Sequence, residues 1–246
     1  GVKIASEKIN KLKAKQMPIS IEEIQSFKEN LPFKLTNAQE RTIKEISEDI
    51  SLAKPMRRLV QGDVGSGKTV VAAMSMYISA KNNSQSVLLC PTEVLAEQHF
   101  KNFSGWFKNL NIKIELLTGK MPVSKRRGIY KDLEDGVIDI LIGTHAVFQE
   151  KVKMKNLGLV VVDEQQRFGV KQRFDLVKKS SHQIMPHQLF MTATPIPRTL
   201  AMTIFADLET SKIDELPPGR KPVETLVYSD KKKDEIVKRL ENVCKS

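Results

Sequence analysis

From residue 56 onward, short apolar runs alternate with longer stretches in which apolar residues recur every three or four positions. Runs of four to six apolar residues fit strands that are buried on both faces, and the longer stretches fit amphipathic helices. The expected strands are residues 58–61, 86–90, 112–117, 138–143, 159–163 and 188–192, and the expected helices are residues 69–81, 93–110, 122–135 and 170–179. This alternation predicts an α/β domain with a mostly parallel, doubly wound sheet.

The first 34 residues have a different pattern and predict a helical lead-in. Charged amphipathic stretches occupy residues 6–15 and 20–29, and the second of them begins with a capping box, Ser20 followed by Glu23. Its apolar positions should form one buried face: Ile21, Ile24 and Phe27. Another capped helix is expected to begin at Thr36, with its own apolar face: Ile43, Ile46 and Ile50.

The end of the chain changes character again. Residues 216–222 are rich in proline and predict a stiff linker, followed by one strand-like run and one helix-like run. A single strand and helix cannot form a domain, so we expect this sequence to be a fragment of a longer protein. The expected organisation is a helical lead-in at 1–34, the α/β domain at 35–215, and a linker with the start of a second, truncated domain at 216–246.

The strongest candidate for chemistry is a glycine-rich loop between the first strand of the domain and its following helix. It matches the pattern G-x-x-x-x-G-K-[ST] at Gly62, Asp63, Val64, Gly65, Ser66, Gly67, Lys68 and Thr69. Backbone N–H groups of such a loop surround phosphate oxygens at a helix N-terminus. Lys68 would reach the β- and γ-phosphates of ATP, and the Thr69 hydroxyl would hold Mg²⁺.

Two acidic residues follow the apolar strand at 159–162. Asp163 at a strand end beside the phosphate loop can hold the Mg²⁺ shell, and Glu164 next to it is placed to activate a water. Thr192 and Thr194 end another apolar run, and two prolines follow them. Taken alone, that segment would be read as a simple polar turn.

Composition and net charge limit the partners and the cellular location that the sequence allows. The 246 residues carry a formal net charge of +11, which fits a polyanion partner such as nucleic acid and fits a solvated, lysine-rich surface about equally well. Two cysteines cannot form a disulfide framework, and no apolar run approaches the roughly 18 residues of a membrane span. We therefore expect a cytoplasmic protein without a structural zinc site.

Two further groups of residues are interpreted as having no role in catalysis or ligand binding. The four histidines lack metal-ligand spacing and are read as chance polar positions: His99, His145, His182 and His187. Trp106 lies at helical spacing with neighbouring phenylalanines and is interpreted as core: Phe100, Phe103 and Phe107.

The loop at 62–69, the acidic segment at 163–166 and the threonines at 192–194 resemble motifs I, II and III of superfamily 2 helicases. Longer matches at residues 61–72, 91–99 and 191–200 are similar to the RecG family of bacterial ATP-dependent branched-DNA helicases, over about residues 35–227. The transcription-repair coupling translocases share several of these segments and are the nearest alternative. The loop at 65–67 and the segment at 163–165 favour the RecG family.

This resemblance implies a RecA-like P-loop NTPase domain and roles for further residues. Gln39 would read the adenine base, and Thr192 and Thr194 would couple nucleotide state to the hold on DNA. Four residues correspond to segments that contact the DNA backbone: Thr92, Glu93, Gly119 and Thr144. Gln166 stands where the RecG pattern has histidine, which puts the strength of coupling in doubt and leaves the roles of Asp163 and Glu164 untouched.

The expected function is the first motor lobe of a helicase that uses ATP and Mg²⁺ to remodel branched DNA, such as stalled forks and Holliday junctions. Its partners within the full protein would be a wedge domain and a second RecA-like lobe with the arginine finger, and no membrane is expected. Alone, the chain should bind nucleotide weakly, hydrolyse it very slowly and not unwind DNA. The alternatives are a nucleotide-gated module that acts through protein partners and, more remotely, a small-molecule P-loop kinase.

Overall fold

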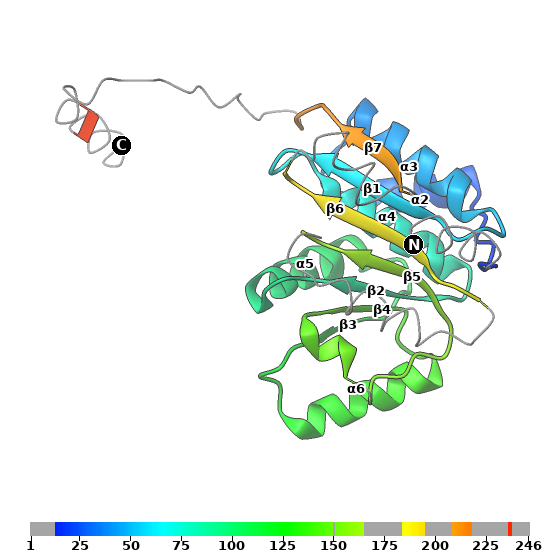
Figure 1. Cartoon of the computed structure of the whole chain (residues 1–246), viewed down its shortest axis with the longest axis vertical. Helices are drawn as coiled ribbons and strands as arrows, with labels where there is room; N and C mark the ends of the chain where they lie inside the picture. Colours follow the sequence, from blue (N-terminus) through cyan, green and yellow to red (C-terminus); the bar gives the residue numbers. More distant parts are fainter. Residues whose placement is uncertain (1–12, 150, 165–183, 195–207, 218–235, 238–246) are drawn as a thin grey trace, which may run out of the picture.

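The computed structural model describes residues 13–149, 151–164, 184–194, 208–217 and 236–237. Seven strands form one sheet in which every neighbouring pair is parallel, in the order β3-β4-β2-β5-β6-β1-β7 (Figure 1). The strands are β1 (Arg57–Gly62), β2 (Gln85–Leu89), β3 (Ile114–Leu117), β4 (Ile140–Gly143), β5 (Leu157–Val162), β6 (His187–Thr192) and β7 (Glu209–Ile213). The predicted α/β class is confirmed, with an all-parallel sheet.

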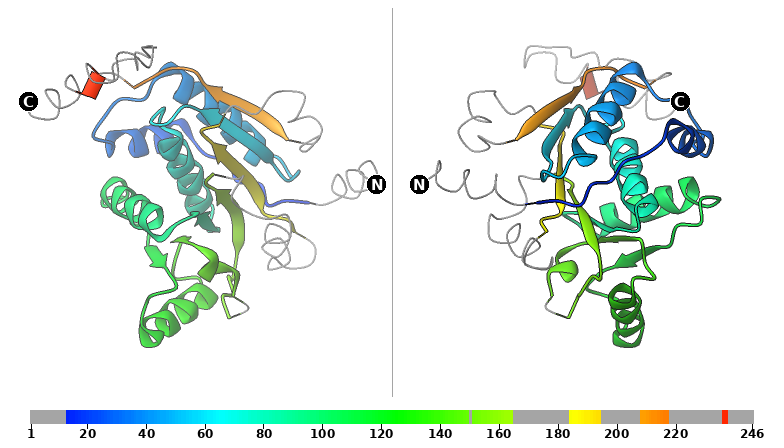
Figure 2. Two further views of the ribbon diagram at one scale, coloured as in Figure 1. Left: turned by 60° about the vertical axis from the view of Figure 1, so that its left-hand side comes forward. Right: turned by 90° about the vertical axis from the view of Figure 1, so that its right-hand side faces the viewer.

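The sheet has a hydrophobic core on each face because successive residues of a strand point to opposite sides. Val60 and Leu88 belong to one core, whereas their chain neighbours Leu59 and Val87 belong to the other. The first core is closed by α2 (Ile21–Glu29), α3 (Asn37–Ile50), α4 (Lys68–Lys81) and α5 (Glu93–Trp106), and the second includes α6 (Val123–Asp135), as Figures 1 and 2 show. A short 3₁₀ helix, η1 (His145–Phe148), follows β4.

The six expected strands are present, and three of the expected helices match α4, α5 and α6. The helix expected at 170–179 lies outside the described residues. The helix expected at 93–110 ends early, at Trp106, and the following turn includes Asn111 with a left-handed backbone (φ 52°). That turn delays the next strand, so β3 begins at Ile114 instead of residue 112.

The lead-in is helical only in part. The capping box of Ser20 and Glu23 begins α2 as predicted, and Phe27 is fully buried against Tyr77 and Phe107. The prediction for Ile21 is wrong, since it is 81% exposed in the first turn of α2, before the helix reaches the core. Residues 13–19 are extended instead of helical and cross the amino ends of the strands (Figure 2).

Backbone contacts explain why that segment is extended. Lys13 forms a parallel bridge with Ile184, and Met17 N–H donates to the carbonyl of Ile50 at the end of α3. These bonds to distant backbone groups replace the bonds that a helix would make within itself. The helix expected at Thr36 is confirmed as α3, with its three isoleucines buried: Ile43, Ile46 and Ile50.

Strand β7 was not predicted from the sequence. Its residues Glu209, Thr210 and Lys212 are exposed, and only Ser211 and Ile213 point into the protein. The strand lies at the edge of the sheet beside β1, where a half-polar strand is expected. Among the described residues, no helix has the length and apolar character that crossing a membrane requires. The domain boundaries at 34/35 and 215/216 remain predictions.

Candidate functional site

The glycine-rich loop connects the carboxyl end of β1 to the start of α4. Gly65 and Gly67 have φ of 79° and 87°, a left-handed backbone that favours glycine. A Cβ on Gly67 would also lie 2.1 Å from Nε2 of Gln39, so this position has no room for a side chain. Within the described residues no side chain caps α4. The uncapped helix N-terminus and the helix dipole therefore favour an anion at this loop.

Lys68 is the first residue of α4 and folds over the loop. Its Nζ donates to the carbonyl oxygens of Gly62 (2.6 Å) and Asp63 (3.0 Å). Burial lowers the pKa of the Lys68 ammonium, while the nearby carboxylates of Glu164, Asp163 and Asp63 oppose that shift. The structure thus brings the two acidic residues that follow β5 to the phosphate loop, although they are nearly 100 positions away in the sequence.

The two acidic residues differ in backbone geometry. Asp163 is buried, and its N–H donates to the carbonyl of Leu89, which continues the pairing of β5 with β2. Glu164 is only partly buried and has φ of 50°, which is uncommon for a residue other than glycine. A backbone held in such a conformation is frequently found at functional sites.

A histidine that the sequence analysis dismissed lies within this site. Nε2 of His99 on α5 is 2.9 Å from Oδ2 of Asp163, and His99 is 7% exposed. The interpretation of His99 as a chance polar position is wrong, because the contact joins elements that are 64 residues apart and no spacing rule reveals it. His145 is exposed, and His182 lies outside the described residues.

Gln39 is buried against the phosphate loop. Its side-chain oxygen accepts the N–H of Thr36 (2.9 Å), and its Nε2 donates to the carbonyl of Ser66 (2.8 Å). This amide therefore connects the start of α3 to the loop. Gln39 also lines a cavity of about 520 Å³ at the loop, together with Phe33, Lys34, Gly67, Thr69, Val70, Trp106 and Pro217.

The tryptophan of α5 packs against the core, as predicted, and it also lines the cavity at the loop. Phe103 and Phe107 are buried in the core, but Trp106 is half-buried and its ring meets Phe33 edge to face at 5.8 Å. Both rings line the cavity at the loop, so they give it an aromatic wall. Phe100 packs against the core from a partly buried position.

Thr192 and Thr194 lie at the carboxyl end of β6. Thr192 is fully buried and pairs in register with Gln61 at the end of β1, directly before the phosphate loop. Its hydroxyl accepts the N–H of Thr194 (3.1 Å), which forms a tight polar turn beside the loop. Gln166, the third residue predicted to act in coupling, lies outside the described residues.

The four residues predicted to contact DNA follow three neighbouring strands. Thr92 and Glu93 come after β2, Gly119 after β3, and Thr144 directly after β4, and these strands are adjacent in the sheet. Glu93 makes an ion pair with Lys120 (3.1 Å), next to Gly119. The Thr92 hydroxyl accepts the N–H of Leu95 and caps α5, and Thr144 is largely buried.

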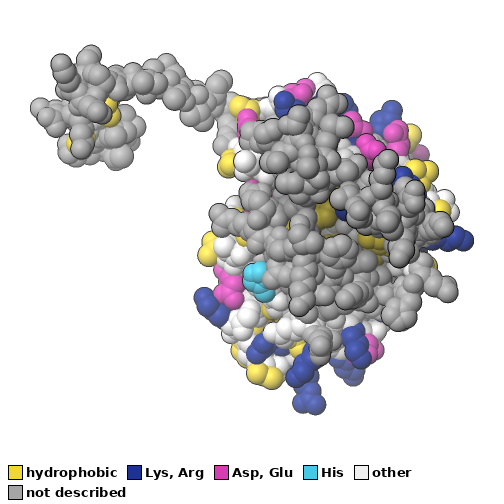
Figure 3. All heavy atoms as spheres, viewed as in Figure 1, with side chains coloured by type: hydrophobic (Ala, Val, Ile, Leu, Met, Phe, Trp, Pro, Cys, Tyr) yellow, Lys and Arg dark blue, Asp and Glu magenta, His cyan; other side chains and the backbone are white. Residues whose placement is uncertain are grey.

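The basic surface lies near this part of the sheet. In the space-filling view, lysine and arginine side chains gather at the end of the molecule that carries α6 (Figure 3). The sequence of α6 contains four basic residues: Lys125, Arg126, Arg127 and Lys131. Its acidic residues lie at its end, so the excess of positive charge lies in the first half of the helix, which follows the carboxyl end of β3.

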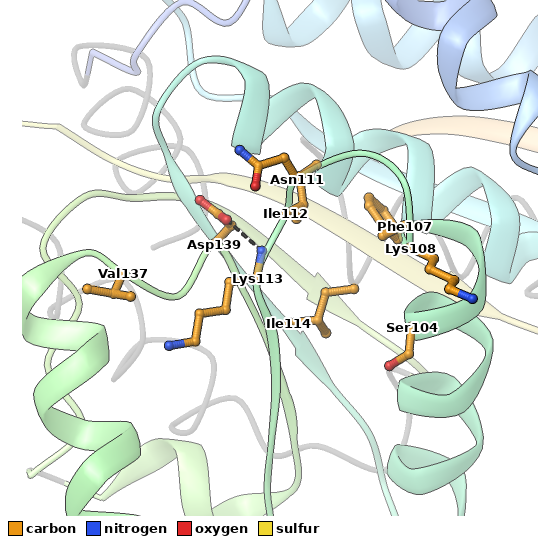
Figure 4. A pocket seen from close by; sticks show the side chains of 9 residues that line it. All are labelled: Ser104, Phe107, Lys108, Asn111, Ile112, Lys113, Ile114, Val137 and Asp139. Atoms are coloured by element: carbon orange, nitrogen blue, oxygen red, sulfur yellow. Dashed lines mark hydrogen bonds between the residues drawn. The ribbon is translucent and has the colours of Figure 1, made fainter.

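A second cavity, of about 590 Å³, lies at the amino ends of the strands, on the side of the sheet opposite the phosphate loop. It is bounded by residues that precede β3 and β4, including Lys113 and Asp139, and by Ser104, Phe107 and Lys108 around the end of α5 (Figure 4). Asp139 accepts the backbone N–H of Lys113 (2.8 Å), and burial raises the pKa of its carboxyl group. Ligands of open parallel sheets bind at the carboxyl ends of the strands. The cavity at the phosphate loop is therefore the better candidate for a ligand-binding site.

The fold and the loop together define a P-loop ATPase lobe, and comparison with known proteins gives its family. The family model for DEAD/DEAH box helicases matches residues 36–203. The chain belongs to the DEAD/DEAH box helicase family. Its relatives are ATP-dependent DNA helicases of the RecG type: it is 48% identical over 242 residues to RecG of Aquifex aeolicus and 51% identical over 221 residues to RecG of Haemophilus influenzae.

Those alignments cover 98% and 89% of this chain but only 30% and 32% of the two relatives. The chain therefore spans about a third of their length. A solved structure of RecG bound to a three-way DNA junction matches with a TM-score of 0.83 at 39% identity, over 97% of this chain and 31% of that one. A hypothetical ATP-dependent RNA helicase from Sulfolobus tokodaii shares the fold, at 18% identity and a TM-score of 0.57, over 78% of this chain and 57% of that one.

Proposed function

We propose that this chain is the nucleotide-binding motor lobe of a RecG-type helicase, whose full protein uses ATP to remodel branched DNA. The observation that carries the proposal is the position of Lys68, which lies on the phosphate loop and close to Asp163 and Glu164. A lysine and two carboxylates at the end of a parallel sheet are the groups that nucleotide hydrolysis requires. Similarity to RecG over nearly the whole chain supports DNA as the partner.

The nucleotide would lie along the loop with its phosphates on the N–H groups of residues 62–69 and on Lys68. Its base would enter the cavity of about 520 Å³ that borders Gly67 and Thr69. Beyond its bonds to Thr36 and Ser66, the Gln39 amide retains one N–H and one oxygen lone pair with which to read the adenine edge there. The exposed ring of Phe33 and the half-buried ring of Trp106 offer apolar contact. The aromatic wall formed by Phe33 and Trp106 supports this placement.

Mg²⁺ would be held by the Thr69 hydroxyl and the Asp163 carboxylate. Both are hard oxygen ligands, and Mg²⁺ at phosphate sites typically takes one or two protein ligands, the rest coming from phosphates and water. When bound, the ion neutralises phosphate charge. Glu164 is the base that would orient and deprotonate the attacking water.

DNA would contact the carboxyl ends of β2, β3 and β4 through Thr92, Glu93, Gly119 and Thr144. Thr192 and Thr194, at the end of β6, are placed between the nucleotide site and the rest of the edge, and we infer that they report nucleotide state, with Gln166 as a further participant. Action on branched DNA would need the wedge domain and the second lobe that the resemblance implies. We infer a cytoplasmic location from the similarity to bacterial RecG proteins.

The test is a titration of fluorescent ATP analogue with Mg²⁺, using the chain and two lysine variants. Lys68→Ala should weaken binding at least about tenfold, because the charged hydrogen bonds of the lysine to phosphate are lost. Lys81→Ala is the matched control: Lys81 ends the same helix, pairs with Glu23 at 3.2 Å on the surface and should bind nucleotide as the parent does.

Equal binding by the parent and Lys68→Ala would reject the loop as the phosphate site. Steady-state hydrolysis measured on the same samples should be very slow and insensitive to DNA, because the arginine finger is expected on the second lobe. Rapid DNA-stimulated hydrolysis by the parent would contradict that part of the proposal.

A further inference from the structure

His99 on α5 makes a buried contact with the carboxylate proposed to hold the metal ion. Nε2 of His99 and Oδ2 of Asp163 are 2.9 Å apart, and their side chains are only 8% and 12% exposed. The ring of His99 also packs against Phe103 on the same helix. The contact is therefore fixed by packing on one side and by a hydrogen bond on the other.

The direction of this hydrogen bond follows from the chemistry of the two groups. An ionised carboxylate only accepts hydrogen bonds, so Nε2 carries the hydrogen and donates it to Asp163. The second ring nitrogen, Nδ1, is buried and has no hydrogen-bond partner among the residues that the structure describes. The contact with Asp163 is thus the one polar role visible for this ring in the described part of the chain.

Asp163 is held at two points by these interactions. Its backbone N–H donates to Leu89 of β2, and its Oδ2 accepts from His99, while the described residues make no hydrogen bond to Oδ1. Oδ1 can therefore face a cation, while the hydrogen bond from His99 to Oδ2 keeps the carboxylate from rotating. Groups that hydrogen-bond a ligating carboxylate typically affect metal affinity 10–100-fold.

We propose that His99 is the positioning residue for Asp163 and links the position of α5 to the Mg²⁺ site. The inference rests on the proposed function, in which Asp163 holds Mg²⁺. Thr92 caps α5 and Glu93 is its first residue, and both lie at the edge proposed to contact DNA. His99 is six residues further along the same helix, so a displacement of α5 by DNA would move the hydrogen bond to Asp163.

The experiment measures the Mg²⁺ concentration that half-saturates the increase in affinity for a fluorescent ATP analogue. His99→Leu keeps apolar bulk beside Phe103 and removes the donor, and we expect its half-saturating Mg²⁺ concentration to rise about tenfold. His99→Gln retains an N–H donor of similar reach and should restore most of that loss. Affinity for the analogue in EDTA should be the same in all three chains.

Urea unfolding and circular dichroism check that each variant is folded. If His99→Leu does not fold, His99→Asn replaces it, because the shorter amide cannot span the distance to Asp163. An unchanged Mg²⁺ requirement in the variant without the donor would overturn the proposal, as would equal impairment of His99→Gln. Failure of the parent to bind nucleotide would instead reject the proposed function, so the two failures are distinguishable.

A second readout tests the link through α5. Duplex DNA should shift the half-saturating Mg²⁺ concentration of the parent, and the shift should disappear in His99→Leu and return in His99→Gln. A shift of equal size in His99→Leu, or no shift in the parent, would show that α5 does not transmit DNA binding to Asp163.

Discussion

Two buried histidines lie at opposite ends of the strands of the same sheet and have different surroundings. The side of the sheet with the amino ends of the strands is called the amino edge, and the side with their carboxyl ends the carboxyl edge. His187 begins β6 at the amino edge, where Nδ1 accepts the N–H of Met56 (3.0 Å) and Nε2 donates to the carbonyl of Lys15 (2.8 Å). His99 lies at the carboxyl edge and donates to a side chain, Asp163, while its other nitrogen has no partner among the described residues. One ring joins backbone to backbone, and the other holds a carboxylate.

The same contrast separates the two buried glutamines. Gln85 at the amino edge donates to the carbonyls of Leu133 and Ile138 and accepts the N–H of Asn156, so its amide is taken up by the fold. Gln39 at the carboxyl edge bonds the phosphate loop and borders a cavity. Residue type and burial are alike within each pair. The end of the sheet at which a side chain lies is what distinguishes the residues that we propose to act at the nucleotide site.

The largest effect that would test this contrast is expected at the loop. Gly67→Ala places a Cβ in a left-handed residue and against Nε2 of Gln39, so the bond from Gln39 to Ser66 should be lost. We expect the free energy of unfolding to fall by about 2–4 kcal/mol and the affinity for nucleotide analogue to decrease together with it. Urea denaturation and the binding titration measure the two quantities.

Gly128→Ala is the control for that variant. Gly128 lies within α6 and has nothing within 4 Å of an added Cβ, so alanine should stabilise the protein by about 0.5–1 kcal/mol. If Gly67→Ala were as stable as the parent, the close packing of the carboxyl edge would be refuted.

A smaller effect is expected at the amino edge. Burial lowers the pKa of His187 from its usual 6.5, so the unfolded chain binds a proton that the folded chain does not. Stability should therefore decrease as the pH falls below about 6.5, by at most about 1.4 kcal/mol per pH unit from this group. His187→Gln keeps a donor and an acceptor but does not titrate, and it should flatten the dependence of unfolding free energy on pH between 7.5 and 5.5. A slope identical to that of the parent would mean that His187 is not the group responsible.

The smallest effect is expected on DNA binding. Lys120 is 89% exposed and pairs with Glu93, so Lys120→Gln should remove a phosphate contact and leave Glu93 uncompensated. We expect a loss of about two- to fivefold in duplex affinity at low salt. The slope of log affinity against log salt should become less steep by about 0.9.

Lys44→Gln is the control for that variant. Lys44 is an exposed lysine on α3 paired with Glu48, and the variant should bind duplex as the parent does. Equal losses of duplex affinity in both variants would indicate a general effect of net charge. They would contradict a DNA contact at the carboxyl ends of β2, β3 and β4.

Much of this architecture could be predicted from sequence because the central strands are continuous apolar runs and the loop at 62–69 has a specific pattern. Strand β7 could not be predicted, since only Ser211 and Ile213 of its five residues point inward. The contact of His99 with Asp163 depends on the order of the strands in the sheet, which periodicity does not reveal. The proximity of Asp163 and Glu164 to Lys68, by contrast, is expected from the motifs. The burial of Ile21 failed for a related reason, because an amphipathic pattern does not say where a helix first meets the core.

The position of β1 in the sheet also has a consequence for the order of folding. β1 pairs with β6 and β7, and 131 positions separate Met56 from its hydrogen-bond partner His187. During synthesis the strand that carries the phosphate loop therefore has no neighbour until residue 192 has left the ribosome, and no second neighbour until residue 213. Contacts at such separations form slowly because a long loop must close first. The β3–β4 and β2–β4 pairings, which join Ile114 and Ser86 to Ile140, span fewer positions and can form earlier. We therefore expect the nucleotide site to be assembled late.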